Sequence, residues 1–281
     1  MKYFLNSITS KAYWAYIFSL NGLKSILAIY GVIWLIIESL DFFKIYTQDK
    51  YSKYAFLIFI GIALLFSILL RRPIKSITIP FKEYDFAVEV KIADIFQEQG
   101  AIVISSNSKF ESDVAGGKIS VNSLQGQFTA KYYTGNQTGL EESIADELNE
   151  IEGSQPYSMG TTVPIHTHGK TFYFVAMAHL GENGNASTTL SDINQALSGL
   201  WNYVRDNGEL QELVIPVLGT GRGRLEVSRK KMIARIVESF VKESKVNKFS
   251  EKLVITIRPK DAENFGINLY EIKDHLNHVL S

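Results

Sequence analysis

The two longest apolar stretches without a charge both lie within the first 75 residues. One runs from Tyr54 to Leu70, and a shorter one from Ser25 to Ile37 extends through its flanks to about 20–43. Both are apolar around the whole helix rather than along one stripe, which is typical of membrane-spanning helices. The pattern predicts a transmembrane hairpin over residues 1–75, with helices at about 20–43 and 54–71. The alternative is a pair of buried helices in a soluble domain.

Basic residues are more numerous on the side of this hairpin that carries both chain ends. Three lie in the connecting loop, namely Lys44, Lys50 and Lys53. Six lie on the other side, namely Lys2, Lys11, Lys24, Arg71, Arg72 and Lys75. Since Lys and Arg favour the cytoplasmic side of a membrane, we expect both termini and the C-terminal part in the cytoplasm.

Strand and helix patterns alternate after Pro73. Short apolar runs predict strands at 86–90, 101–105, 171–178, 213–218 and 253–258. Apolar residues at helical spacing predict helices at 140–151, 190–204, 233–241 and 269–279. Strands that are apolar throughout, separated by amphipathic helices, indicate an α/β sheet covered on both faces. We therefore expect a second domain at 76–281, with ligands bound at the carboxyl ends of its strands.

Composition excludes several classes of function. The chain carries 29 Lys plus Arg against 29 Asp plus Glu, so its formal net charge is zero. Binding to nucleic acid relies on excess Lys and Arg to neutralise phosphates, and we therefore expect no nucleic-acid partner. The absence of Cys removes disulfides, Cys-ligated zinc, iron–sulfur clusters and thiol nucleophiles. Any chemistry must use hydroxyls, carboxylates, amides, imidazoles or the backbone.

A glycine-rich loop follows the predicted strand at 213–218. Its residues are Gly219, Thr220, Gly221, Arg222 and Gly223. Alternating glycines let the backbone approach an anion closely, and the next helix start and the arginine add positive charge. These features predict a loop that holds a phosphate or diphosphate. A plain glycine-rich turn explains the motif by itself equally well.

A second loop follows the predicted strand at 101–105. It begins with Asn107 and later carries the pair Gly116 and Gly117. An Asn at the end of a strand presents both a donor and an acceptor to a sugar hydroxyl. The same residue can instead simply turn or cap the chain.

The segments KIADIFQEQGAIVISSN, GGK and VIPVLGTGRGRL together resemble the macro domain, the ADP-ribose-binding fold. The resemblance covers roughly Phe81 to Ser281 and implies a mixed sheet flanked by helices. It also implies that Asp94 binds the adenine amino group, with the Ile95 backbone nearby, and that Asn107 contacts the distal ribose.

The same resemblance assigns the diphosphate to the two loops. Gly116 and Gly117 belong by this comparison to the first diphosphate loop, and residues 219–223 form the second. Ser123 and Gln125, in the unusual segment SLQGQF, complete the implied ligand contacts.

The whole chain resembles a narrower family, the membrane-anchored macro effectors of type II Thoeris, a bacterial antiphage system. The resemblance implies that a separate TIR-domain enzyme consumes NAD on infection and makes a histidine conjugate of ADP-ribose. It further implies that this chain binds the conjugate as a signal, with no cofactor, then forms a homo-oligomer and disrupts the inner membrane. The implied partners are the signal nucleotide, the TIR enzyme, the lipid bilayer and further copies of the chain.

Departures from the macro-domain pattern argue against catalysis. The motif Asn-Ala-Ala-Asn is replaced by residues 104–107, Ile-Ser-Ser-Asn, and the long glycine run of the hydrolases is reduced to one pair. We therefore expect a binding protein without catalytic residues. A membrane-tethered ADP-ribosyl hydrolase that uses Asn107 is the alternative, and a protein-recruiting scaffold is a third. On a strand His166 and His168 would share a face, but no third ligand accompanies them and His-Gly-Lys is typical of a tight turn, so we expect no metal site.

Overall fold

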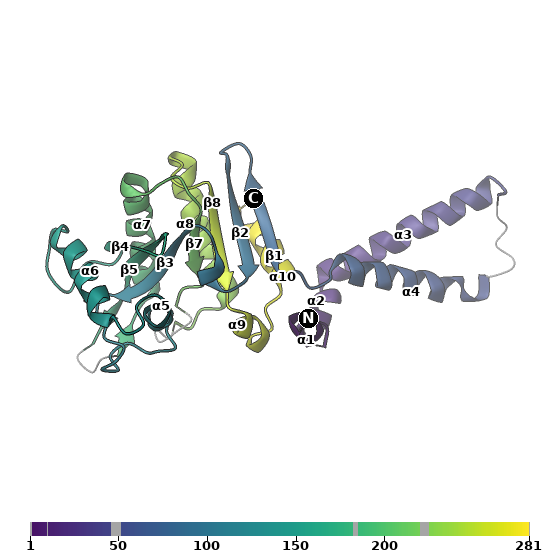
Figure 1. The fold of residues 1–281 in the computed structure, drawn as a ribbon. Coiled ribbons are helices and arrows are strands. Elements are labelled where there is room, and N and C mark those ends of the chain that lie inside the picture. Colours follow the sequence, from purple (N-terminus) through teal and green to yellow (C-terminus); the bar gives the residue numbers. More distant parts are fainter. Residues whose placement is uncertain (1, 10, 46–51, 182–184, 220–224, 281) are drawn as a thin grey trace. The chain divides into compact units, whose positions relative to one another are not determined.

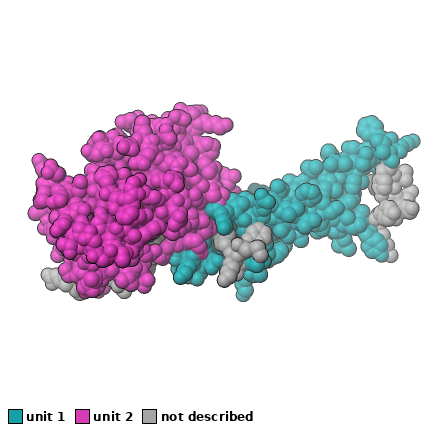
Figure 2. All heavy atoms as spheres, in the orientation of Figure 1, with its two compact units in different colours: residues 1–75, 260–272 teal, residues 76–259, 273–281 magenta. Residues whose placement is uncertain are grey.

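The computed structural model describes residues 2–9, 11–45, 52–181, 185–219 and 225–280. The chain divides into two compact units (Figure 2). The first contains residues 1–75 and 260–272, and the second contains residues 76–259 and 273–281. The sequence analysis places 260–272 in the C-terminal domain, but this segment clusters with the N-terminal helices.

Side-chain contacts explain why residues 260–272 belong to the first unit. The ring of Tyr270 stacks on Tyr16, with centroids 5.8 Å apart and an interplanar angle of 15°. Its hydroxyl donates a hydrogen bond of 3.0 Å to the carbonyl oxygen of Leu70. Arg71 lies over the other partner of this stack, 4.6 Å from the centroid of the Tyr16 ring. The C-terminal segment is therefore held at the end of the second apolar helix.

The described helices of the first unit are α1 (Lys2–Thr9), α2 (Lys11–Ile17), α3 (Leu20–Phe42), α4 (Ser52–Leu70), α9 (Pro259–Asn264) and the start of α10 (Leu269–Leu280). Ser19 caps α3, because its side chain accepts a hydrogen bond from the Gly22 amide. By length and composition α3 can cross a membrane, and only 6% of its most apolar window is buried. The apolar part of α4, Tyr54–Leu70, is shorter.

The second unit is built on a mixed sheet. The strands are β1 (Ser76–Phe81), β2 (Phe86–Ile92), β3 (Ala101–Asn107), β4 (Thr162–Thr167), β5 (Lys170–Leu180), β6 (Ala186–Ser187), β7 (Leu213–Pro216) and β8 (Lys252–Ile257). Their order is β1-β2-β8-β7-β3-β5-β4, and β6 pairs with β5 off this path. The central strands β2, β8, β7, β3 and β5 are parallel, and β1 and β4 add antiparallel edges.

Helices cover both faces of this sheet (Figure 1). They are α5 (Leu124–Tyr132), α6 (Gln137–Asn149), α7 (Leu190–Asn207) and α8 (Arg229–Val246), and a short 3₁₀ turn, η2 (Ile95–Gln97), follows β2. Ile102 and Ile104 of β3 pack in one core with Phe128 of α5 and Leu140 of α6. Alternate residues face the other way, as Tyr173 of β5 does when it meets Tyr203 of α7 edge to face.

The predicted α/β fold with helices on both faces is confirmed, and each predicted strand and helix of the second unit is present. The elements not predicted are β1, β4, β6, α5 and η2 in the second unit and α1, α2 and α9 in the first. The two edge strands β1 and β4 each contain a proline, Pro80 and Pro164, which weakens a strand pattern and is tolerated at the edge of a sheet.

Candidate functional site

Several predicted ligand-binding residues lie at one edge of the sheet. Because β2, β3 and β7 are parallel, their carboxyl ends meet at the same edge. Asp94 follows β2, Asn107 ends β3, and Gly219 follows β7. The fold therefore gathers residues that are 125 positions apart in the chain (94 to 219).

The turn after β2 is organised by Asp94. Its side chain is exposed, and one carboxylate oxygen accepts a hydrogen bond of 3.1 Å from the Phe96 amide. The side chain of Ile95 is buried and anchors the turn to the core. Lys170 fixes the C-terminal end of this turn, because its Nζ donates hydrogen bonds to the carbonyl oxygens of Phe96 at 3.0 Å and Glu98 at 2.7 Å. The second oxygen of Asp94 is thus carried on a rigid, exposed turn.

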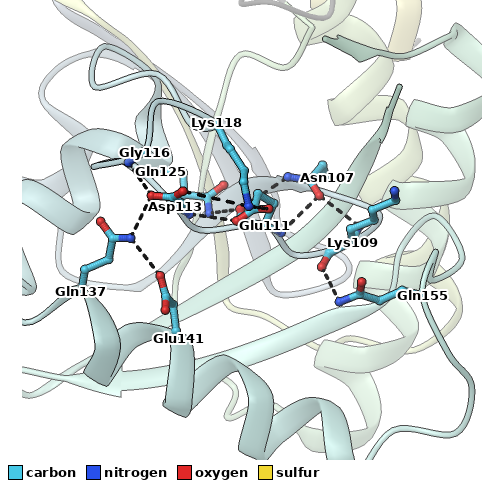
Figure 3. Close-up of polar contacts among 10 residues, drawn as sticks. All are labelled: Asn107, Lys109, Glu111, Asp113, Gly116, Lys118, Gln125, Gln137, Glu141 and Gln155. Carbon is cyan, nitrogen blue, oxygen red and sulfur yellow. Dashed lines mark hydrogen bonds and ion pairs between the residues drawn. The ribbon is translucent and has the colours of Figure 1, made fainter. Parts of the chain in front are cut away.

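Asn107 organises the loop that follows β3 (Figure 3). The register with β5 shifts between Ser106 and Asn107, an irregularity that redirects the chain. The Asn107 side chain is buried, and its Oδ1 accepts hydrogen bonds from the amides of Lys109 at 3.0 Å and Glu111 at 3.2 Å. Its Nδ2 donates to the Glu111 carbonyl oxygen at 3.4 Å. Both ends of the amide that the resemblance assigns to the ribose are engaged by their own loop.

The glycine pair is tied to an acidic side chain. The Gly116 amide donates a 2.6 Å hydrogen bond to Oδ1 of Asp113, and Gly117 has a φ of +81°, which suits glycine. Gln137 braces the same carboxylate, with Nε2 at 3.3 Å from Oδ1. The hydrogen bond from the Gly116 amide, followed by that from Gln137, lowers the pKa of Asp113. The carboxylate is therefore ionised at neutral pH.

Ser123 and Gln125 begin helix α5. The Ser123 hydroxyl caps the helix by accepting a hydrogen bond of 2.9 Å from the Gly126 amide. Gln125 is buried, and its Nε2 donates a 2.9 Å hydrogen bond to the carbonyl oxygen of Glu111. Gln125 and Asn107 therefore meet at the same carbonyl, and they fix the loop between β3 and α5 from both ends.

The second predicted loop is described only at its start. Gly219 has a φ of +68°, a backbone conformation that favours glycine, and a Cβ at this position would lie 2.6 Å from a methyl carbon of Leu225. Thr220, Gly221, Arg222 and Gly223 lie outside the described residues.

Sequence reasoning missed part of this network. Lys118 Nζ lies 2.9 Å from Oε2 of Glu111, and the other oxygen of Glu111 accepts the amide of Asp113 at 3.1 Å. The ion pair with Glu111 raises the pKa of Lys118. The three-residue spacing of Asp113 and Gly116 in the sequence could have indicated the hydrogen bond between them. Ser123 and Asn136 likewise stand three positions before glycines whose amides they accept.

The two histidines do not share a strand face, because His166 lies in β4 and His168 lies in the turn that follows it. The Nδ1 atom of His166 lies 3.1 Å from the hydroxyl oxygen of Thr171 on the paired strand. His168 and Gly169 both have positive φ and make the two-residue connection between β4 and β5. Within the described part of the chain, no group of three or more His, Cys, Asp or Glu side chains could hold a metal ion.

Comparisons with known proteins agree with this fold. Residues 88–258 match the family described as Thoeris protein ThsA, Macro domain. The Thoeris protein ThsA of Bacillus amyloliquefaciens (strain Y2) is 27% identical over 202 residues, which cover 66% of this chain and 67% of that protein.

Solved macrodomain structures share the fold at low sequence identity. The Oceanobacillus iheyensis macrodomain with ADP has a TM-score of 0.51 at 13% identity, over 73% of this chain and 96% of that one. A single-residue mutant of the same macrodomain with ADPR has a TM-score of 0.50 at 13% identity, over 73% of this chain and 98% of that one. The family match spans most of the second unit, from β2 to the residue after β8, so the chain belongs to the ThsA macro-domain family of Thoeris proteins.

Proposed function

We propose that the second unit binds an ADP-ribose derivative at the carboxyl edge of its sheet and that binding switches the first unit, which is anchored in a membrane. The observation that carries this proposal is the joining, in one chain, of a ThsA-type macro domain and a helix long and apolar enough to cross a membrane. A fold of this kind is found in structures with ADP and ADPR, which supports the class of ligand.

The derivative that we propose is histidine-ADP-ribose, supplied by a TIR-domain enzyme as the resemblance to type II Thoeris effectors implies. The first unit would lie in the inner membrane with both termini in the cytoplasm. Binding would assemble several copies, and the clustered apolar helices would then disrupt the bilayer. Many large apolar side chains of α3 and α4 are exposed in the single chain, among them Leu27, Leu35, Phe56 and Leu65, and lipid or other copies would cover them.

Covalent connectivity supports transmission between the units. The chain passes from the first unit to the second after residue 75, returns after residue 259 and leaves again after residue 272. A change in the second unit therefore reaches the first through three chain segments instead of one linker. The fixed contacts of Tyr270 with Tyr16 and Leu70 would carry it to the end of α4.

A hydrolase is the alternative function. Hydrolysis in that hypothesis relies on Asn107 to position the substrate. The Asn107 amide is already bonded to the backbone of Lys109 and Glu111, which favours a role in shaping the loop. We therefore prefer a binding protein.

Calorimetric titration of the full-length protein in detergent tests the ligand. We expect tight binding of histidine-ADP-ribose, weaker binding of ADP-ribose and little binding of NAD. An absence of binding by either ADP-ribose compound would contradict the proposal. Release of free ADP-ribose from the conjugate during the titration would favour the hydrolase instead.

Replacement of Tyr270 tests the coupling. Tyr270→Ala removes both the stack on Tyr16 and the bond to Leu70, whereas Tyr270→Phe removes only the bond. We expect Tyr270→Ala to bind ligand normally but to lower ligand-dependent dye release from liposomes by about fivefold or more, the usual range of a coupling free energy. Tyr84→Ala, an exposed tyrosine of the second unit, is the control. Undiminished dye release in Tyr270→Ala would show that the signal takes another route.

A further inference from the structure

Many backbone amides of the loop between β3 and α5, including both amides of its glycine pair, already donate to acceptors from the protein itself. The acceptors are Asn107 for the amides of Lys109 and Glu111, Glu111 for Asp113, Gln137 for Ala115, Asp113 for Gly116, Val114 for Gly117, and the Asp113 carbonyl for Ile119. A loop that binds phosphate does so mainly through such amides. A ligand that uses the amide of Gly116 or Gly117 must therefore replace its internal partner.

Two of these acceptors are carboxylates and so resemble a phosphate, and Asp113 makes the shorter hydrogen bond, to an amide of the glycine pair. Its carboxylate is an anion bonded to the amide of Gly116, and this is a short, charge-assisted hydrogen bond of 2.6 Å. The carboxylate also lies against the bare Cα of that glycine, since an added Cβ would be 2.1 Å from Oδ2. The carboxylate fills the space beside the amide that a ligand oxygen would need.

The surrounding charges make the loop unfavourable to a second anion. Lys118 pairs with Glu111 at 2.9 Å and lies 4.0 Å from Asp113, so its charge is shared between two carboxylates. Glu141 adds a further carboxylate, which accepts a hydrogen bond of 2.8 Å from Gln137. The cluster of three acidic groups and one lysine thus carries a net negative charge at a loop that is expected to receive a diphosphate (Figure 3).

The Asp113 side chain is nevertheless not packed into the core. Its side chain is 26% exposed, and the groups that hold it are two hydrogen bonds and a distant lysine rather than a packed core. Displacement would leave the loop anchored by Asn107 and Gln125, whose contacts with Glu111 do not involve Asp113.

On this basis, and on the proposed function, we infer that Asp113 is an internal competitor for the ligand's diphosphate, which must expel this carboxylate from the Gly116 amide. Asp113 thereby raises the concentration of ligand needed to occupy the site. It sets the affinity of the site, because any ligand that uses the Gly116 amide must offer enough additional contacts to offset the displacement.

Asp113→Asn tests the inference with a change of almost no volume. Asn can still accept the Gly116 amide, but a neutral acceptor forms a weaker hydrogen bond and does not repel phosphate. We expect full-length Asp113→Asn in detergent to bind ADP-ribose about fivefold more tightly than the wild type, the upper range for the interaction of exposed charges. Adenosine, which has no phosphate, should bind both proteins equally.

Two further variants complete the test. Gln137→Leu removes one of the hydrogen bonds that hold the Asp113 carboxylate, and it should give a smaller gain in affinity for ADP-ribose. This variant tests the inference if Asp113→Asn does not fold. Asp85→Asn removes an exposed carboxylate that pairs with Lys248 at 2.7 Å, and it should leave the affinity unchanged.

Equal or weaker binding of ADP-ribose by Asp113→Asn, with the wild type binding normally, would overturn this inference alone. An equal gain in affinity for adenosine would also overturn it, because the effect would then not concern the diphosphate. Failure of the wild type and all variants to bind ADP-ribose or its histidine conjugate would overturn the proposed function, and this inference with it.

Discussion

Asp94→Ala is expected to weaken the binding of ADP-ribose by about ten- to hundredfold, the effect of losing a hydrogen bond to a charged group. The resemblance to macro domains assigns the Asp94 carboxylate to the adenine amino group. The structure gives the residue a second role, since one oxygen caps the turn through the Phe96 amide at 3.1 Å. A loss of binding in Asp94→Ala alone would therefore have two explanations.

Asp94→Asn separates these two roles. The Asn oxygen can still accept the Phe96 amide, so the turn and the melting temperature should be preserved. The other position of the side chain becomes an amino group, which cannot accept a hydrogen bond from adenine. We expect both variants to lose affinity in calorimetry, and only Asp94→Ala to melt at a lower temperature. Normal binding by Asp94→Asn would exclude the carboxylate as an adenine contact, and Asp146→Asn on the exposed face of α6 is the control.

Phe128→Ala is expected to lower the free energy of unfolding by about 3–5 kcal/mol, as is usual when a buried phenylalanine is truncated. Phe128 is fully buried, and its ring lies 4.7 Å from Phe172, 5.1 Å from Phe174 and 5.2 Å from Tyr132 between centroids. The residue joins α5 to the sheet. The same helix carries Gln125, so we expect the variant to lose ligand affinity as well.

Urea unfolding of the full-length protein, followed by circular dichroism, measures this effect. Phe128→Leu keeps most of the volume and should cost less than half as much. Leu210→Ala, at a side chain that is 57% exposed, should change the stability by no more than about 0.5 kcal/mol. A loss of less than about 1 kcal/mol in Phe128→Ala would mean that α5 is not held by this aromatic cluster.

The parts of the fold that the sequence predicts are those in which burial alone determines the pattern. The strand at Ala101–Asn107 begins with four fully buried residues, and α7 repeats its apolar positions at helical spacing over five turns. Helix α5 was missed because its buried positions include Gln125, Gly126 and Thr129, which break the apolar period. Its position is set by capping and by contacts with distant residues.

The sequence placed the candidate residues at strand ends, and the fold brings those ends to one edge of the sheet, but the sequence did not predict the contacts among them. Strand order brings the ends of β2, β3 and β7 together, and the motifs lie at those ends. The partners of Asn107 and the role of Asp113 depend on the path of the loop, which a sequence pattern does not determine. An Asp three residues before a glycine indicates a capped turn, but it does not reveal that the capped amide belongs to the loop that we propose binds the diphosphate.

The most direct test of the central claim is hydrogen–deuterium exchange of the full-length protein with and without histidine-ADP-ribose. The account predicts that the ligand slows amide exchange in two segments, 94–98 after β2 and 107–126 between β3 and α5. It also predicts changed exchange in residues 260–272, which belong to the first unit. Bound ligand that leaves both of the first two segments unprotected would contradict the account, because the nucleotide would then lie elsewhere than at the carboxyl edge of the sheet.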